Sequence, residues 1–307
     1  MTQRWAYLGP AGTFTEQATL ELRQRADGDV ELHPAGSVGA AIADVRAGAM
    51  QAACVPIENS VEGAVPLTLD ELTHGEPLVI SAEAYVTVRL DLLVRAGTST
   101  ADIRKLGSHP HGHAQVRSFV TSRLPAAESV VFGSTAAAAA AVAAGELDAA
   151  AAAPAAGRHY GLVSAAEDIG EIHGAVTRFV LLRLPGPPVP RTGNDRTSLV
   201  VYVQDEPGSL LSVLAELANR GINLTRLESR PARSELGKYF FLLDADGHID
   251  DPAMADAVAA LHRRSAGVRF LGSYPRGAGT AHTPPAFASP AAFARARAFV
   301  DGLGAGR

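Results

Sequence analysis

The sequence predicts an α/β protein of two domains. In residues 1–185, short apolar segments with strand character alternate with segments of helical pattern, which is typical of lobes built on mostly parallel sheets. The stretch PGPPVPRTGNDR (185–196) has four prolines and two glycines in twelve residues, so neither a helix nor a central strand can continue through it. After this stretch the order changes to β-α-β-β-α-β.

The elements of the first domain follow one another in a regular order. Thr13 and Glu16 have capping-box spacing, in which each residue can satisfy an unpaired N–H of the first helical turn. Residues 147–154 (LDAAAAAP) stay open between a helix, which alanine favours, and a short buried strand, which the order of the lobe favours. Residues 78–95 predict a long strand or a hairpin. We further expect strands at 4–9, 30–34, 52–57, 128–133 and 178–184, and helices at 13–24, 37–48, 111–122, 134–145 and 155–162.

The second domain is predicted to be a ferredoxin-like unit at 197–275, joined by a linker at 186–196. Gly208 opens its first helix, where the amide either receives a ligand carboxylate or simply belongs to the helical turn. The tail at 276–307 is rich in Ala, Pro and Gly, so we expect it to pack weakly or to be disordered, apart from a short helix at 290–302. The strands are expected at 197–204, 222–231, 238–247 and 267–275, and the helices at 208–221 and 252–264.

The composition excludes several classes of protein. The net charge is −5 and no block of like charges occurs, which argues against nucleic-acid binding. No signal-peptide pattern follows the first residues, and the Ala-rich region at 135–153 is too often interrupted to span a membrane. The single cysteine, Cys54, cannot form an intrachain disulfide and is expected to be a buried small side chain. We therefore expect a cytoplasmic protein without nucleic-acid or membrane partners.

Three alternating histidines stand out in SHPHGHAQVRSF (108–119). His109, His111 and His113 could face one metal ion only in an extended segment, and neither a nearby cysteine nor an H-E-x-x-H helix supports a zinc site. The better interpretation is a loop that leads into a helix N-terminus, where free N–H groups can bind an anion. The sequence therefore predicts no metal here.

Polar residues gather where predicted strands end or begin. Glu58, Asn59 and Ser60 follow a strand, so they line a ligand crevice or form an Asx turn that caps the next helix. Thr177 and Arg178 begin an apolar strand, where the arginine is either a clamp for a substrate carboxylate or an ordinary sheet-edge charge. The residues alone leave these alternatives open.

Five motifs taken together resemble one family. They are GPAGTFTEQA, PIENSVEG, SHPHGHAQ, YGL…AEDIG…TRF and LTRLESRP, and the resemblance runs from Tyr7 to Pro275. In this order and spacing the chain resembles the prephenate dehydratases, which convert prephenate to phenylpyruvate. The second domain resembles an ACT domain, a βαββαβ module that typically binds an amino acid at a dimer interface. Small departures from the family pattern are Ala165, Glu171 and Ser209.

The resemblance implies a catalytic domain like the type II periplasmic binding proteins. Its first lobe would hold about 1–78 and 166–185, its second lobe about 79–165, and a cleft would lie between them. The implied catalytic residues are Thr177, Arg178 and Phe179. The implied substrate-binding residues are Asn59, Ser60, Ser108, Gln115, Glu58 and Thr13.

The resemblance also implies a role for several of these residues. Thr177 would donate or relay a hydrogen bond to the leaving hydroxyl, Arg178 would provide positive potential for a carboxylate, and Phe179 would pack against the ring. Glu58 is a rival proton donor if burial raises its pKa. Loss of CO2 and water involves no redox step, so the resemblance implies neither a nicotinamide nor a metal cofactor.

Regulation by L-phenylalanine is implied as well, in a homodimer or homotetramer. The implied effector site comprises Gly208, Ser209, Leu210, Asn223, Leu224, Glu228, Ser229, Arg230 and Pro231. Two rival functions remain: a non-catalytic small-molecule sensor with the same lobes, and an arogenate dehydratase with the same chemistry on an aminated side chain.

Overall fold

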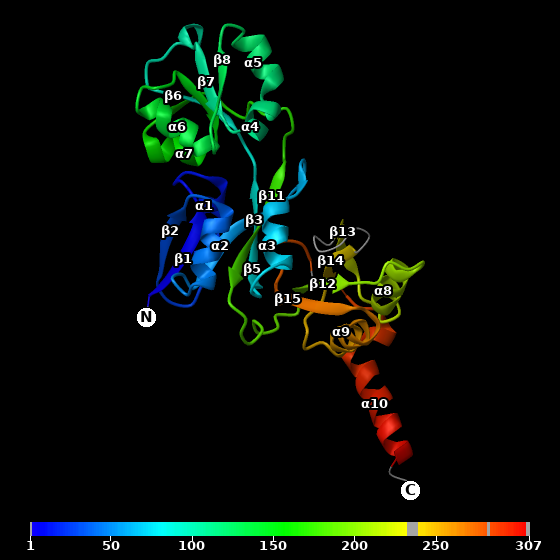
Figure 1. The fold of residues 1–307 in the computed structure, drawn as a ribbon. Coiled ribbons are helices and arrows are strands. Elements are labelled where there is room, and N and C mark those ends of the chain that lie inside the picture. Colours follow the sequence, from blue (N-terminus) through cyan, green and yellow to red (C-terminus); the bar gives the residue numbers. More distant parts are fainter. Residues whose placement is uncertain (1, 232–238, 281–282, 305–307) are drawn as a thin grey trace. The chain divides into compact units, whose positions relative to one another are not determined.

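The computed structural model describes residues 2–231, 239–280 and 283–304, and its chain divides into two compact units (Figure 1). The first unit is Met1–Glu71 with Ala84–Leu182, and the second is Leu72–Glu83 with Arg183–Arg307. The mixed strands and helices confirm the α/β class. Residue 238 of the strand expected at 238–247 and residues 281–282 and 305–307 of the tail lie outside the described residues.

The first lobe is built on a sheet with the strand order β2-β1-β3-β11-β5, in which β4 pairs with β3. β1 runs parallel to β2 and β3, whereas β11 is antiparallel to β3. The strands are β1 (Gln3–Leu8), β2 (Val30–Ala35), β3 (Ala52–Asn59), β4 (Gly63–Ala64), β5 (Val79–Thr87) and β11 (Val176–Arg183). The helices are α1 (Phe14–Arg23), α2 (Val38–Arg46) and α3 (Pro66–Thr73).

The second lobe is built on a sheet with the order β10-β6-β9-β7-β8. The open stretch at 147–154 contains the fully buried strand β9, which lies between β6 and β7. The strands are β6 (Asp91–Val94), β7 (Lys105–Ser108), β8 (Glu128–Val131), β9 (Ala149–Ala152) and β10 (Val163–Ala166). The helices are α4 (Pro110–Gln115), α5 (Arg117–Arg123), α6 (Thr135–Ala143) and α7 (Pro154–Tyr160), and a 3-10 turn covers Thr100–Asp102.

Two expectations for this region need correction. The second lobe was expected to begin at 79, but β5 pairs with β11 in the sheet of the first lobe, so the change of lobe follows Thr87. The helix expected at 111–122 is divided into α4 and α5, because Val116 leaves helical geometry with φ −112° and ψ 11°. Both β7 and β10 were missed because their four residues include Gly107 or Ser164 and lack a clear apolar alternation.

The second unit carries the predicted ferredoxin-like domain, with the order β13-β14-β12-β15. Its core contains Leu199, Val213, Phe241 and Leu261, which come from the sheet and from both helices. The elements are β12 (Asp195–Tyr202), α8 (Ser209–Ala218), β13 (Leu224–Pro231), β14 (Tyr239–Asp246), α9 (Pro252–Arg264) and β15 (Gly267–Pro275).

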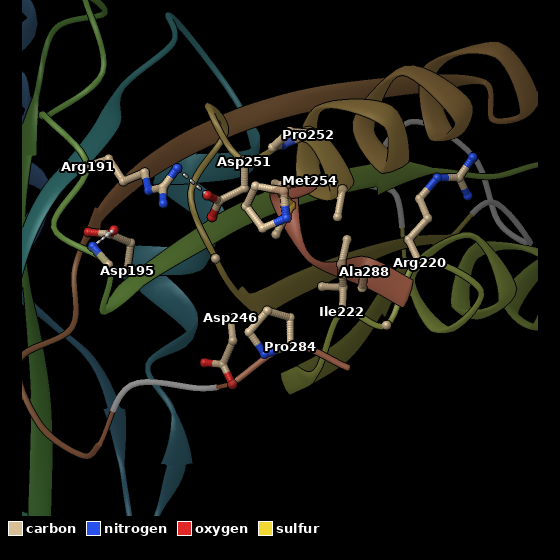
Figure 2. A pocket seen from close by; sticks show the side chains of 15 residues that line it. Arg191, Asp195, Arg220, Ile222, Asp246, Asp251, Pro252, Met254, Pro284 and Ala288 are labelled. Atoms are coloured by element: carbon tan, nitrogen blue, oxygen red, sulfur yellow. Dashed lines mark hydrogen bonds and ion pairs between the residues drawn. The ribbon is translucent and has the colours of Figure 1, made fainter. Parts of the chain in front are cut away.

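The tail packs against this domain at its start. The 3-10 turn Ala286–Ala288 buries Ala288, and Figure 2 shows Ala288 and Pro284 with Ile222 and Met254 around a pocket of about 240 Å³. Only Ala288 of this turn is buried, while Phe287 stays 61% exposed, so the packing of the tail is limited here. The helix expected at 290–302 is confirmed as α10 (Pro290–Gly304).

Within the described ranges, we find no helix with the length and apolar character needed to cross a bilayer.

Candidate active site

The first unit contains a cavity of about 600 Å³, which is the size of a small-molecule site. Its wall is made of strand ends and helix starts from both sheets. Asn59 ends β3, while Thr177 and Phe179 begin β11, which pairs with β3. Thr13, Gln115 and Ser134 contribute side chains from helix ends. The cavity therefore brings together residues separated by more than half of the chain.

Asn59 and Thr177 are joined by a hydrogen bond of 2.8 Å from Asn59 Nδ2 to Thr177 Oγ1. The orientation of the amide is fixed, because Asn59 Oδ1 accepts the backbone N–H groups of Val61 and Glu62 at 2.8 and 3.0 Å. The NH2 group must then face Thr177, whose oxygen acts as the acceptor. The hydroxyl hydrogen of Thr177 is left to donate elsewhere, and Thr177 is a wall residue of the cavity.

Three helices begin at the cavity wall. Their N-cap residues are Thr13 for α1, His109 for α4 and Ser134 for α6, and all three line the cavity. Each side chain accepts a backbone N–H of its own first turn. Helix N-termini carry partial positive charge, so α1 and α6 add positive potential to a wall that also contains the Glu62 carboxylate.

The surroundings of His109 favour its neutral form. Burial, followed by the neighbouring charges of His111 and His113, lowers the pKa of His109 below its ordinary value. The rings of His109 and His111 stack with centroids 5.1 Å apart. A neutral His109 near pH 7 leaves the positive potential of the wall to the helix ends.

The predicted site residues divide into two groups. Those that line the cavity are Thr13, Asn59, Gln115, Thr177 and Phe179. Ser108, in contrast, has 0% of its surface exposed and donates its hydroxyl to the carbonyl of Ala151 at 2.8 Å. Ser108 is therefore not a wall residue of the cavity in this structure, and its role towards a substrate stays a prediction.

Arg178, Glu58 and Ser60 also lie outside the cavity wall. Strand alternation turns Arg178 away from the side shared by Thr177 and Phe179, and its guanidinium forms an ion pair of 3.7 Å with Glu58. Ser60 Oγ accepts the N–H of Val176 at 2.9 Å and so holds the start of β11. In this structure Arg178 and Glu58 join β11 to β3, and Ser60 holds the start of β11, so none of the three lines the cavity.

Sequence reasoning missed most of the wall. The polar residues that it missed are Thr15, Glu62, His109, His111, Ser134 and Thr135. The signal for Ser134 was present, because a serine follows a predicted strand and opens a predicted helix, as Thr13 does. His109 and His111 were considered as metal ligands and then as loop residues, but not as part of the wall.

The three alternating histidines point to different partners. His111 Nδ1 lies 3.2 Å from Glu62 Oε2, and His113 Nε2 lies 3.0 Å from the carbonyl oxygen of Val130. In the part of the chain that the structure describes, no group of three or more His, Cys, Asp or Glu side chains has an arrangement that could hold a metal ion.

The expected effector residues lie at the start of α8 and along β13. Gly208 is the N-cap of α8 with φ +86°, a conformation that favours glycine, and Ser209 Oγ donates to the carbonyls of Gln204 and Glu206. Asn223 Nδ2 donates to Asp246 Oδ2 at 2.7 Å. Leu210 is partly exposed, and Leu224, Glu228, Ser229, Arg230 and Pro231 lie on β13, an outer strand of the sheet.

The fold and the cavity define a two-lobed α/β protein of the type II periplasmic-binding-protein kind, joined to a ferredoxin-like domain. A family model for prephenate dehydratase matches residues 5–186, and a model for the ACT domain matches residues 197–263. The chain belongs to the prephenate dehydratase family.

Individual relatives agree over most of the chain. The prephenate dehydratase of Mycobacterium marinum is 48% identical over 288 residues, which cover 92% of this chain and 91% of the relative. The crystal structure of the prephenate dehydratase of Arthrobacter aurescens in complex with L-Phe is 44% identical, with a TM-score of 0.89 and coverage of 98% and 99%. A protein described as a novel type of quorum quenching acylase is 31% identical, with a TM-score of 0.77 and coverage of 89% and 98%.

Proposed function

We propose that this chain is a prephenate dehydratase, a carbon–oxygen lyase of phenylalanine biosynthesis. Prephenate is a dianion with a ring hydroxyl and a ring carboxylate. With one added proton it gives the phenylpyruvate anion, CO2 and water, and the formation of an aromatic ring drives the reaction. The enzyme therefore has to assist the departure of hydroxide as water and hold two carboxylates.

The hydrogen bond from Asn59 to Thr177 is the observation that carries this proposal. Because Asn59 donates to Thr177 Oγ1, the threonine keeps its own hydrogen, and we infer that it donates this hydrogen into the cavity that it lines. A hydroxyl that donates to the leaving oxygen stabilises the charge that develops there. Threonine is too weak an acid to lose its proton outright, so we assign it the role of a hydrogen-bond donor or relay to the leaving group.

The two substrate carboxylates are assigned to the helix N-termini at Thr13, His109 and Ser134. Gln115 is a neutral donor for the substrate, and Phe179 packs beside the ring. Arg178 would add positive potential from behind β11, partly offset by Glu58. Ser60 and Ser108 would act by holding the backbone, through Val176 and Ala151 respectively.

Phenylalanine is the proposed effector. The relative from Arthrobacter aurescens was crystallised with L-Phe, and this chain has an ACT domain with the implied residues at the start of α8 and on β13. We propose that L-phenylalanine binds there in a homodimer or homotetramer and shifts the enzyme towards an inactive state. Assembly state and a cytoplasmic location stay predictions.

The test of this function is a direct assay of the purified chain. Prephenate and arogenate are supplied side by side, and phenylpyruvate is followed by its absorbance in alkali while phenylalanine is quantified by chromatography. We expect prephenate to be converted with the higher kcat/KM. Absence of turnover with both substrates would support the non-catalytic sensor, and a clear preference for arogenate would reassign the substrate.

A further inference from the structure

The loop between β1 and α1 is held by a carboxylate rather than by its own backbone. Glu16 Oε2 accepts the N–H of Gly12 at 2.7 Å, and Glu16 Oε1 accepts the hydroxyl of Tyr7 at 3.1 Å. The capping-box spacing predicted that this carboxylate would return to the N-cap residue, Thr13. Instead it reaches one residue further back and joins the loop to the end of β1.

The same loop forms part of the cavity wall. Leu8, Gly9 and Thr13 all line the cavity, and Thr13 Oγ1 donates to the carbonyl of Leu8 at 3.1 Å while it accepts the N–H of Glu16 at 3.2 Å. The position of Thr13 therefore depends on the two ends of the loop, and Glu16 fastens the segment between them.

The loop also contacts the second lobe. Tyr160 of α7 donates its hydroxyl to the carbonyl of Ala11 at 3.1 Å. Gly12 has φ +85°, and a Cβ there would lie 2.8 Å from the Cα of Ala156 in α7. A displacement of this loop would consequently change both the wall of the cavity and the contact between the lobes.

The Tyr7 hydroxyl and the Glu16 carboxylate are suited to a stable charge-assisted hydrogen bond. Burial and then the neighbouring Glu16 carboxylate raise the pKa of the Tyr7 phenol, so this hydroxyl stays protonated and donates. Tyr7 is buried in the core of the first lobe, which makes it a rigid anchor. Hydrogen bonds to a charged acceptor are stronger than those between neutral groups.

We propose that Glu16 is a positioning residue for the dehydratase reaction, which holds residues 9–13 against α7 so that the cavity wall has the shape that binds the substrate. The proposal rests on the proposed function for its substrate. Glu16 itself does not touch the reacting atoms, so its loss should weaken binding more than it slows the chemical step.

The test compares Glu16→Ala with Glu16→Gln, which keeps an acceptor for the N–H of Gly12. The matched control is Glu21→Ala on the same helix, where the carboxylate pairs with Arg25 at the surface. We expect Glu16→Ala to raise KM for prephenate by about tenfold while kcat stays within about threefold. Glu16→Gln should restore KM to within about threefold of wild type, and Glu21→Ala should match wild type.

A second measurement does not depend on the reaction. Hydrogen exchange of a peptide covering residues 8–13 should be faster in Glu16→Ala than in wild type and unchanged in Glu21→Ala. Unchanged exchange in Glu16→Ala, or faster exchange with KM within twofold of wild type, would overturn the proposal. If Glu16→Ala does not fold, Tyr7→Phe, which removes the hydroxyl that donates to Glu16 Oε1, takes its place and should show faster exchange and a higher KM than Glu16→Gln. A wild-type chain without activity on prephenate would refute the proposed function, and exchange would still decide whether Glu16 holds the loop.

Discussion

Asn59 and Thr177 lie 118 positions apart in the sequence and meet in one hydrogen bond between neighbouring strands, with Asn59 Nδ2 donating to Thr177 Oγ1 at 2.8 Å. The direction of this bond matters more than its length. A threonine oxygen that accepts from an amide keeps its own hydrogen for the cavity, so the pair acts as an oriented donor.

Replacing the hydrogen-bond donor of Asn59 by an acceptor should impair catalysis. In Asn59→Asp both side-chain oxygens are acceptors, so Thr177 would donate to the aspartate instead of to the substrate. We expect kcat to fall by about 10²-fold, as for the loss of one oriented donor, in steady-state assays with prephenate. Asn219→Asp, an exposed site at the end of α8, controls for the added charge. A kcat within threefold of wild type would show that the polarity of this bond is irrelevant.

A buried ion pair should dominate the stability of the second unit. Arg196 Nη1 lies 2.6 Å from Glu83 Oε2, and both side chains are almost fully buried. Arg196→Leu would leave the Glu83 carboxylate in the interior, although the N–H of Gly277 still donates to it. We expect a loss of about 3–5 kcal/mol in the free energy of unfolding, measured by urea unfolding.

The matched control for this pair is the double variant Glu83→Leu/Arg196→Leu, which removes both charges. It should recover most of the loss, since two apolar side chains leave no uncompensated charge. A single variant that loses less than about 1 kcal/mol, or a double variant as unstable as the single one, would contradict this assignment.

His109 should make the protein less stable in mild acid. Burial lowers the pKa of His109, so as the pH falls through its ordinary value near 6.5 the unfolded chain takes up a proton before the folded chain does. Stability contributed by neutral His109 is therefore present above that pH and is lost below it. The acid shift is the fall in melting temperature between pH 7.5 and pH 5.5. It should be smaller for His109→Asn, which keeps an acceptor for the helix cap, than for wild type.

Exposed His262, in the last turn of α9, is the matched control for this comparison. His262→Asn should retain the acid shift of the wild type. An acid shift in His109→Asn as large as that of the wild type would exclude His109 as its source.

Alanine segments show how far local pattern predicts this fold. Residues 135–143 and 149–152 are almost equally rich in alanine, yet the first segment is α6 and the second is the buried strand β9. Propensity alone assigns both to helix. The strand is selected by its place between β6 and β7, which is a tertiary effect that composition does not encode.

The sequence predicted which strand ends form the site better than it predicted which side chains line the cavity. Motif resemblance indicated the strand ends that carry Asn59 and Thr177, and both line the cavity. It also indicated Ser108, but the direction of a side chain at a strand end depends on register and on the neighbour it meets. Here Ser108 meets the carbonyl of Ala151, while the following residue, His109, reaches the wall.

The central claim is that the hydroxyl of Thr177 assists the departure of the leaving group, and the most direct measurement is kcat for Thr177→Val beside Thr177→Ser on prephenate. Valine keeps the shape of threonine and serine keeps the hydroxyl. We predict that Thr177→Val lowers kcat by at least about 10²-fold with KM within a few-fold, and that Thr177→Ser stays within about tenfold of wild type. A Thr177→Val enzyme with kcat within a few-fold of wild type would contradict the account.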